Sequence, residues 1–107
     1  MASVLQPIAI VIGIANTTLY DPCIDGTKGR GTLVFLHLVN TTTSDITVSI
    51  FIDMATDVYI ATDLVVPAKG SVDISGAWTV DDTSELIKAI ASAVGVDASG
   101  TVVESDA

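Results

Sequence analysis

The sequence predicts an all-β protein that folds as one antiparallel β-sandwich, Ig-like or jelly-roll-like in its topology. Half of the 107 residues are hydrophobic but only 5% are aromatic, and Val, Ile and Thr, whose branched side chains favour strands, dominate. Apolar and polar residues alternate in segments spaced about eight to twelve residues apart, and Gly, Pro, Asn and Asp separate these segments. A chain of this length suffices for a single domain with a modest core between two sheets.

The N-terminal stretch predicts a first strand with a second role. Ile8–Ala15 is apolar and follows Pro7, which suits the start of a strand because it cannot donate a hydrogen bond. No Lys or Arg precedes the stretch, and it is shorter than the roughly 18 residues of a membrane span, so neither a signal peptide nor a span is expected. We divide the chain into residues 1–15, a first strand and candidate inter-subunit arm, and residues 16–107, the β-sandwich domain.

Two strong strand patterns follow, and we expect them to pair as a β-hairpin. Thr32–Val39 is apolar on both faces, which suits a central strand, and Ile46–Asp53 alternates cleanly. Asn40–Asp45 lies between them and consists of residues that favour turns. In strict alternation, one face of the first strand would hold Val34, Leu36 and Leu38, and the other Leu33, Phe35 and Val39.

The second half of the chain continues the strand pattern with one ambiguous segment. Val58–Val66 and Ser71–Ser75 alternate, and Pro67–Gly70 forms a turn between them. Thr83–Ala93 has the propensity of a helix and only a weaker period of two. The chain ends with a strand around Thr101–Glu104. The side chains that we expect to face inward from the Val58–Val66 strand are Val58, Ile60, Thr62 and Leu64. The expected core includes Leu36, Leu38, Val48, Ile50, Ile60 and Ile74.

The sequence contains no catalytic constellation, so we expect no enzyme, no cofactor and no bound metal. Asp21–Asp25 lacks the regular acidic spacing and the final Glu of a calcium loop. His37 lies between two leucines without a marked nucleophile nearby, which favours a neutral, hydrogen-bonded strand histidine. Cys23 is the only cysteine, which excludes an intrachain disulfide. Phe35 and Trp78 are expected in the core rather than on a ligand platform.

The net charge of the chain limits the kinds of partner that it can bind. Thirteen acidic residues stand against four basic ones, which gives a net charge of −9. Such a charge repels nucleic acids and anionic membranes, so direct binding to either is not expected. It complements a basic protein surface, and it keeps an apolar β-protein soluble.

The order of several short motifs resembles a known family. Leu19-Tyr20 precedes a glycine-containing loop, and then come LVFLHLVNTTTSDITVSIFI, VPAKGSVDISG and ASAVGVDASGTVVE. This succession resembles small virion proteins of tailed bacteriophages over roughly residues 16–104. The chain departs from the family pattern at Asp21–Asp25 and at Thr83–Glu85. The resemblance implies a single β-sandwich that attaches to capsids or tails, and it implies a strand instead of a helix around Leu86–Ala93.

From the resemblance we expect a virion structural protein, first of all a decoration or cement subunit on the outer surface of the head, assembled in the host cytoplasm. A tail, neck or baseplate accessory protein is the alternative. A carbohydrate- or peptide-binding β-sandwich is a second alternative, which would need an exposed aromatic platform. The expected partners are the major capsid protein, copies of the chain itself, or both, and a homotrimer would fit the local three-fold positions of a shell.

Two features predict where such a contact lies. Val4–Ile14 is apolar enough to aggregate if it formed an uncovered edge strand, so we expect a neighbouring chain to cover it. The Asp21–Arg30 loop contains two of the four basic residues. The candidate inter-subunit contacts are Val4, Leu5, Pro7, Ile8, Ile10, Lys28 and Arg30.

Overall fold

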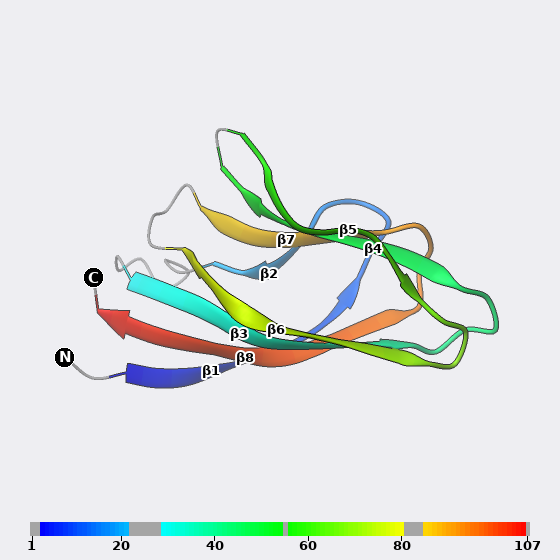
Figure 1. The fold of residues 1–107 in the computed structure, drawn as a ribbon, viewed down its shortest axis with the longest axis horizontal. Coiled ribbons are helices and arrows are strands. Elements are labelled where there is room, and N and C mark those ends of the chain that lie inside the picture. Colours follow the sequence, from blue (N-terminus) through cyan, green and yellow to red (C-terminus); the bar gives the residue numbers. More distant parts are fainter. Residues whose placement is uncertain (1–2, 22–28, 55, 81–84, 107) are drawn as a thin grey trace.

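The computed structural model describes residues 3–21, 29–54, 56–80 and 85–106, and these form two antiparallel sheets stacked face to face (Figure 1). The strands are β1 (Ser3–Ile12), β2 (Thr17–Tyr20), β3 (Gly29–Asn40), β4 (Ile46–Asp53), β5 (Val58–Val66), β6 (Ser71–Val80), β7 (Leu86–Ala91) and β8 (Val96–Asp106). Sheet A has the strand order β1-β8-β3-β6, and sheet B has the order β2-β7-β4-β5. The described residues include no helix, and the predicted antiparallel β-sandwich is confirmed.

The strand order is that of an eight-stranded jelly roll. Every outer pairing joins two strands whose numbers sum to nine, namely β1 with β8, β2 with β7, β3 with β6 and β4 with β5. The pairings of β8 with β3 and of β7 with β4 complete the two sheets. Two interlocked Greek keys produce this pattern, which distinguishes the fold from an Ig-like sandwich.

Most of the predicted strands are present. β4 and β5 have the predicted bounds, and β6 extends the predicted Ser71–Ser75 strand to Val80. The described part of Thr83–Ala93 contains strand β7, as the resemblance implied. Its side chains alternate between buried and half-buried, which shows that burial against the other sheet overrides the helix propensity of this segment.

The predicted hairpin between Thr32–Val39 and Ile46–Asp53 is wrong. Both strands exist, but β3 lies in sheet A, between β8 and β6, and β4 lies in sheet B, between β7 and β5. Each strand has one strongly apolar face, and opposite sheets allow these two faces to cover each other across the core. The Asn40–Asp45 link therefore crosses from one sheet to the other.

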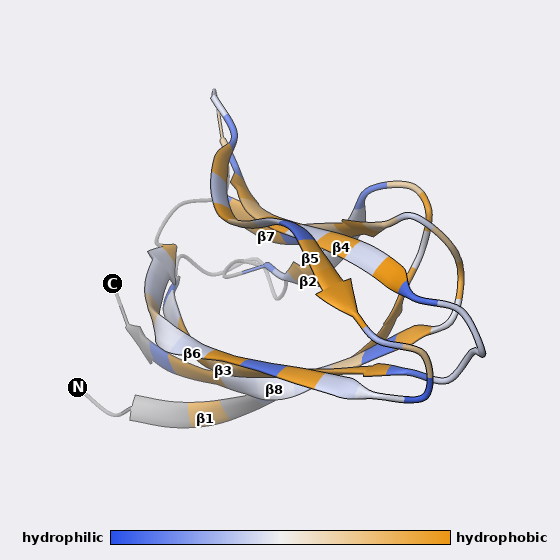
Figure 2. Ribbon diagram, turned by 45° about the vertical axis from the view of Figure 1, so that its right-hand side comes forward, coloured by the Kyte–Doolittle hydropathy of each residue, from blue (hydrophilic) through white to orange (hydrophobic). Residues whose placement is uncertain are grey.

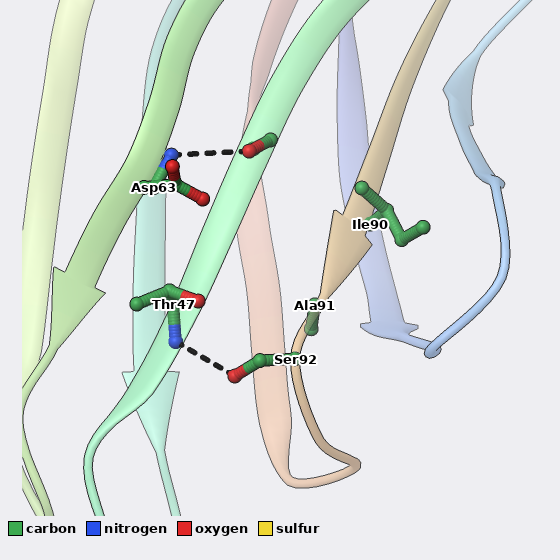
Figure 3. Close-up of a pocket in the computed structure, with 6 residues that line it drawn as sticks. Thr47, Asp63, Ile90, Ala91 and Ser92 are labelled. Carbon is green, nitrogen blue, oxygen red and sulfur yellow. Dashed lines mark hydrogen bonds between the residues drawn. The ribbon is translucent and has the colours of Figure 1, made fainter.

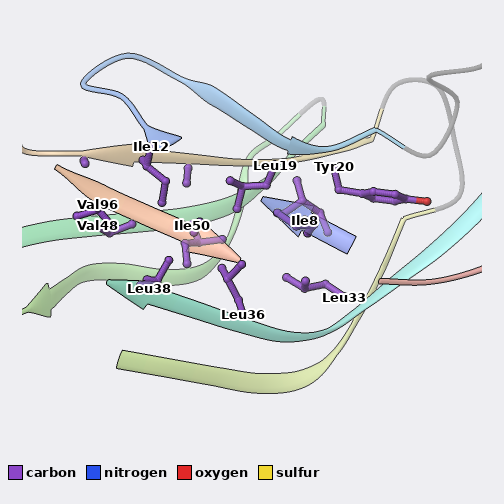
Figure 4. Packing of buried hydrophobic residues seen from close by; sticks show 14 of the residues in the cluster. Ile8, Ile12, Leu19, Tyr20, Leu33, Leu36, Leu38, Val48, Ile50 and Val96 are labelled. Atoms are coloured by element: carbon purple, nitrogen blue, oxygen red, sulfur yellow. The ribbon is translucent and has the colours of Figure 1, made fainter. Parts of the chain in front are cut away.

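The core lies between the two sheets (Figure 4). Apolar and polar residues alternate along much of the strands (Figure 2), and the buried apolar side chains of both sheets form one cluster between them. Trp78 packs against the core as expected, whereas Phe35 lies on the outer face of sheet A and is 38% exposed. Of the expected core residues, Leu36, Leu38, Val48 and Ile50 are fully buried, and Ile60 and Ile74 are partly buried against them.

A bulge in β3 explains why the strict alternation predicted for this strand fails. Leu33 pairs with Val102 of β8 and Phe35 pairs with Thr101, so Val34 is an extra residue on β3. The extra residue allows Leu33 and Leu36 both to face the core. Gly100 of β8 lies beside the bulge, where a Cβ atom would approach the carbonyl oxygen of Phe35 to 2.3 Å.

Candidate functional site

Ionisable side chains of the described residues occur as separate pairs rather than around a cavity. Within this part of the chain, no group of three or more His, Cys, Asp and Glu side chains could hold a metal ion. None of the described segments is a helix long and apolar enough to span a membrane. Three of these pairs are His37 with Asp73, Tyr20 with Glu104 and Lys88 with Asp53.

The His37–Asp73 pair has a serine beside it that the sequence did not indicate. Nδ1 of His37 contacts the carboxylate of Asp73 on β6, and Ser99 of β8 lies opposite His37 on its other side. The row has the residue types of a hydrolase triad, but no hydrogen bond joins Ser99 to His37 among the described contacts. Acyl transfer also requires an oxyanion site and a water-excluding pocket, and this row crosses the exposed outer face of a sheet.

An open hollow on the outer face of sheet B is lined by Thr47, Ser49, Asp63, Ile90, Ala91 and Ser92 (Figure 3). Two of its three hydroxyl groups, those of Ser49 and Ser92, accept hydrogen bonds from the backbone. The N–H of Thr47 donates to Oγ of Ser92 over 3.0 Å, and the N–H of Asp63 donates to Oγ of Ser49 over 3.0 Å. These hydrogen bonds join β4 to the end of β7 and to the middle of β5, and they supply no catalytic group.

Three loops at one end of the sandwich form a single hydrogen-bonded unit around Asn40. Its Nδ2 donates to the carbonyls of Ser44 (2.7 Å) and Val66 (3.0 Å), and its Oδ1 accepts from the N–H of Thr42 (2.9 Å). The N–H of Asn40 donates to the Gly70 carbonyl over 2.9 Å. The side chain is 1% exposed, so this network acts as a structural lock and is not open to a ligand.

The edges of the two sheets differ in how well they are protected against pairing with another chain. β2 is only four residues long. β6 has a register shift at Gly76 and Ala77, which together face Val34 of β3. β5 has two register shifts against β4, and its Asp63 has a positive φ of 48°. Short strands, bulges, charges and Pro residues are the usual means of blunting an edge.

β1 is the least protected edge, and Pro7, which was predicted at the start of a strand, lies in its middle as its one edge-blunting residue. Its ten residues pair with β8 in unbroken register from Ser3 to Ile12, and none of them is charged. Among the residues that the structure describes, no strand pairs with its other side. Leu5 and Val11 are 71% and 55% exposed on the outer face, and Pro7 is exposed between them. This edge is therefore the best candidate for a contact with another chain.

The predicted contact residues are distributed over both faces of β1 and beyond it. Leu5 and Pro7 are exposed as a contact requires, whereas Ile8 is 5% exposed in the core and its side chain is not open to a neighbour. Ile10 is partly buried against the core. Val4 pairs with Glu104 through its backbone, Arg30 is exposed on β3 two strands away from Ser3, and Lys28 lies outside the described residues.

Sequence reasoning missed Val11, which the structure places on the same face as Leu5. The alternation of side chains along a strand could have identified Val11, since residues 5, 7, 9 and 11 share a face. The predicted list instead followed apolarity alone and mixed residues of both faces.

Comparisons with known proteins agree with this description of the fold. No protein-family model matches the sequence, and no curated protein matches it. Among solved structures, a protein of Bacillus endospore appendages, which form disulfide-linked pili, is 15% identical with a TM-score of 0.54, covering 98% of this chain and 87% of that one.

Two viral proteins are similar as well. One belongs to infectious bursal disease virus, Gx strain, and is 10% identical with a TM-score of 0.56 over 99% of this chain, which spans 33% of that protein. The other forms the virus-like particle of the extra small virus of the prawn Macrobrachium rosenbergii, and is 14% identical with a TM-score of 0.52 over 100% of this chain and 81% of that one. At such identities the likeness establishes the shared fold.

Proposed function

We propose that the chain is a non-enzymatic structural subunit of a virion, held to neighbouring subunits through the uncovered edge of β1. The observation that carries the proposal is the contrast between β1 and the other edges. β1 offers ten uncharged residues in unbroken register, while the remaining edge strands are short or bulged. An uncovered flat edge promotes aggregation unless a defined partner covers it.

The likeness to two virus proteins and a pilus protein supports a role in an ordered assembly. The resemblance of the motif order to tailed-phage virion proteins supports a finer assignment, a decoration or cement subunit on the outer surface of the head. Many copies on a shell gain avidity from contacts that are weak individually. The net charge of −9 favours a basic patch on the major capsid protein, and such binding weakens as salt is added.

A tail, neck or baseplate accessory protein would use the same edge, and the pilus protein makes a filament subunit the second candidate. A carbohydrate-binding module finds less support in the aromatic side chains. Phe51 is buried beneath Tyr59, whose ring lies 5.4 Å away at an angle of 43°. Phe35 and Tyr59 are the exposed aromatic rings of the described residues, and they lie on opposite sheets. They therefore form no common platform.

The proposal is tested by quantifying the chain by mass spectrometry in particles purified from cells that produce it. We expect a fixed number of copies per particle for the wild type, and a strong loss of copies for Leu5→Lys, which places a charge on the free edge. Val65→Lys is the matched control, because Val65 is 51% exposed on β5 of the other sheet, and it should keep wild-type occupancy. A chain found only in the soluble fraction would refute the proposal.

A further inference from the structure

We propose that two copies of the chain pair along β1 as antiparallel strands, so that Leu5 of each copy faces Val11 of the other. The inference rests on the proposed assembly role and names the partner at its edge as a second copy. Pairing in this way would join two copies of sheet A into one continuous sheet with a two-fold axis at Ile8. Such an interface is isologous, because the same strand contributes both halves.

Charge explains why a second copy can approach at β1. Two copies that each carry −9 repel each other, and the repulsion is strongest where carboxylates would meet. The outer face of sheet A carries Asp73 and Asp97, and the outer face of sheet B carries Asp53 and Asp63. β1 carries no charge along its whole length, so pairing there brings no carboxylate directly opposite another.

The positions of the exposed apolar side chains select the register. Leu5 and Val11 are 71% and 55% exposed, and both lie three residues from Ile8. When Ile8 of one chain lies opposite Ile8 of the other, each Leu5 faces Val11 of the other chain and each Pro7 faces Ala9. The leucine also has Val103 of β8 as its neighbour within its own chain. Each end of the interface thus gathers these three apolar side chains, with Asp97 of β8 as the neighbour of Val11 within its own chain.

Other antiparallel registers give Leu5 a smaller partner than Val11. A shift by two residues places Leu5 opposite Ala9 or beyond the end of the partner strand. Pro7 is expected to turn its nitrogen toward the free edge, where Pro is tolerated in sheets. Each strand then lacks one backbone hydrogen-bond donor near the two-fold axis. The side-chain contacts between Leu5 and Val11 therefore decide whether the dimer forms.

The first test measures the mass of the purified full-length chain by light scattering after size exclusion. We expect a dimer for the wild type and a monomer for Leu5→Lys, with both proteins showing the same strand spectrum in circular dichroism. Adding Val11→Glu to Leu5→Lys should restore the dimer, because in this register the new lysine of one copy faces the new glutamate of the other. A monomeric wild type, a trimer, or a double variant that stays monomeric would overturn the proposal.

The second test fixes the register by cross-linking in a Cys23→Ser background. Cα atoms directly opposite in an antiparallel pair are about 4.5–5.5 Å apart, within the roughly 4.4–6.8 Å that a disulfide spans. Mixing Leu5→Cys with Val11→Cys should therefore give a covalent dimer on oxidation, while each variant alone gives little. Efficient cross-linking of Leu5→Cys with itself would show another arrangement.

The two proposals fail in distinguishable ways. A wild type that is monomeric in solution but present in fixed copy number on particles refutes the self-pairing and leaves the structural role in place. A wild type that forms the expected dimer but never occurs in particles refutes the role and leaves the self-pairing in place.

Discussion

At the scale of single residues, Asn40 shows how a polar side chain can organise an apolar sandwich. It is the one polar side chain buried in the described part of the chain, and its amide joins the end of β3 to Ser44 and Val66. Backbone carbonyls near the core need hydrogen-bond partners, and the one of Val66 lies in a buried hydrogen bond with this amide. The amide satisfies them and thereby holds the crossover between the two sheets in place.

Asn40→Ala should destabilise the protein by about 1–3 kcal/mol, because the hydrogen bonds from its amide to the carbonyls of Ser44 and Val66 are lost. The measurement is the free energy of unfolding from urea titration. Thr43→Ala is the matched control in the same loop, since Thr43 is exposed, and its effect should stay within about 0.5 kcal/mol. An equal effect of both substitutions would show that the network does not stabilise the crossover.

Gly95 faces the same network from the β7–β8 connection, and its φ of +134° is a conformation that other residues rarely adopt. Gly95→Ala should cost on the order of 1–3 kcal/mol for the backbone alone. An added Cβ would also lie 2.3 Å from Cγ2 of Thr42. Combining Gly95→Ala with Thr42→Ser removes that methyl group, so thermal unfolding of the double variant should recover only the part of the loss that the contact causes. Full recovery would show that the backbone is not strained.

Asp53 gives the protein a small dependence on pH. Its hydrogen bond and ion pair with Lys88, 2.6 Å long, lower the pKa of the carboxyl below its ordinary value of 3.8. A lowered pKa stabilises the folded state above the ordinary pKa, and this contribution is lost as the pH falls through the lowered value. Asp53→Asn should thus be less stable than the wild type at pH 7 and equal to it in strong acid.

The comparison is made by urea unfolding at several pH values. Lys88→Met provides the control, because Asp53→Asn should have no further pH-dependent effect once Lys88 is absent. If the difference between wild type and Asp53→Asn persisted in strong acid, the ion pair would not be its cause.

At the scale of elements, β4 supplies the centre of the core, and Ile50 is fully buried in it. Ile50→Ala should cost about 2–5 kcal/mol, because it removes apolar contacts and leaves a cavity. Val65→Ala on the neighbouring edge strand is the control, since Val65 is 51% exposed. Its effect on the free energy of unfolding should stay within about 0.5 kcal/mol. A loss below 1 kcal/mol at Ile50 would place the core elsewhere.

The strands themselves could be predicted because alternation is a local property of the sequence. Ile46–Asp53 and Val58–Val66 show it without interruption, and the structure has strands with those bounds. The pairing of strands depends on contacts between residues that are far apart in the sequence. A short polar link such as Asn40–Asp45 suits a hairpin and a crossover between sheets equally well. The sequence therefore could not decide between them.

Bulges limited the prediction in the same way. In β5, two register shifts against β4 break the alternation, so Val58 is 51% exposed and Thr62 is exposed although both were expected to face inward. The shifts bend the hairpin of β4 and β5 away from the sandwich (Figures 1 and 2). A bulge depends on the partner strand, which a single segment of sequence does not reveal.

The candidate site shows the same limit. The apolar run predicted that the N-terminal segment would matter, and Leu5 and Pro7 lie exposed on β1. That β1 is an edge, and that the other edges are blunted, follows only from the assembled sheets. The Lys28 part of the prediction lies outside the described residues and stays a prediction.

At the scale of the whole molecule, two layers of sheet share one core, and β1 belongs to it through part of its length. Ile8 and Ile12 are buried between the sheets, whereas Leu5 and Pro7 are exposed before them. The described side chains before Ile8 thus add nothing to the core, whereas the second half of β1 carries core isoleucines on one face and the exposed Val11 on the other. This division predicts different outcomes for two truncations.

Deleting residues 1–7 removes the exposed half of β1 and keeps Ile8 and Ile12, so the protein should still unfold cooperatively, at a lower melting temperature, and should lose occupancy on particles. Deleting residues 1–15 removes both buried isoleucines and uncovers the edge of β8, so we expect no cooperative transition. Circular dichroism during heating distinguishes the two variants. If residues 16–107 melted cooperatively at the wild-type temperature, the whole N-terminal segment would be a separable arm, and the buried isoleucines would contribute nothing to the stability of the sandwich.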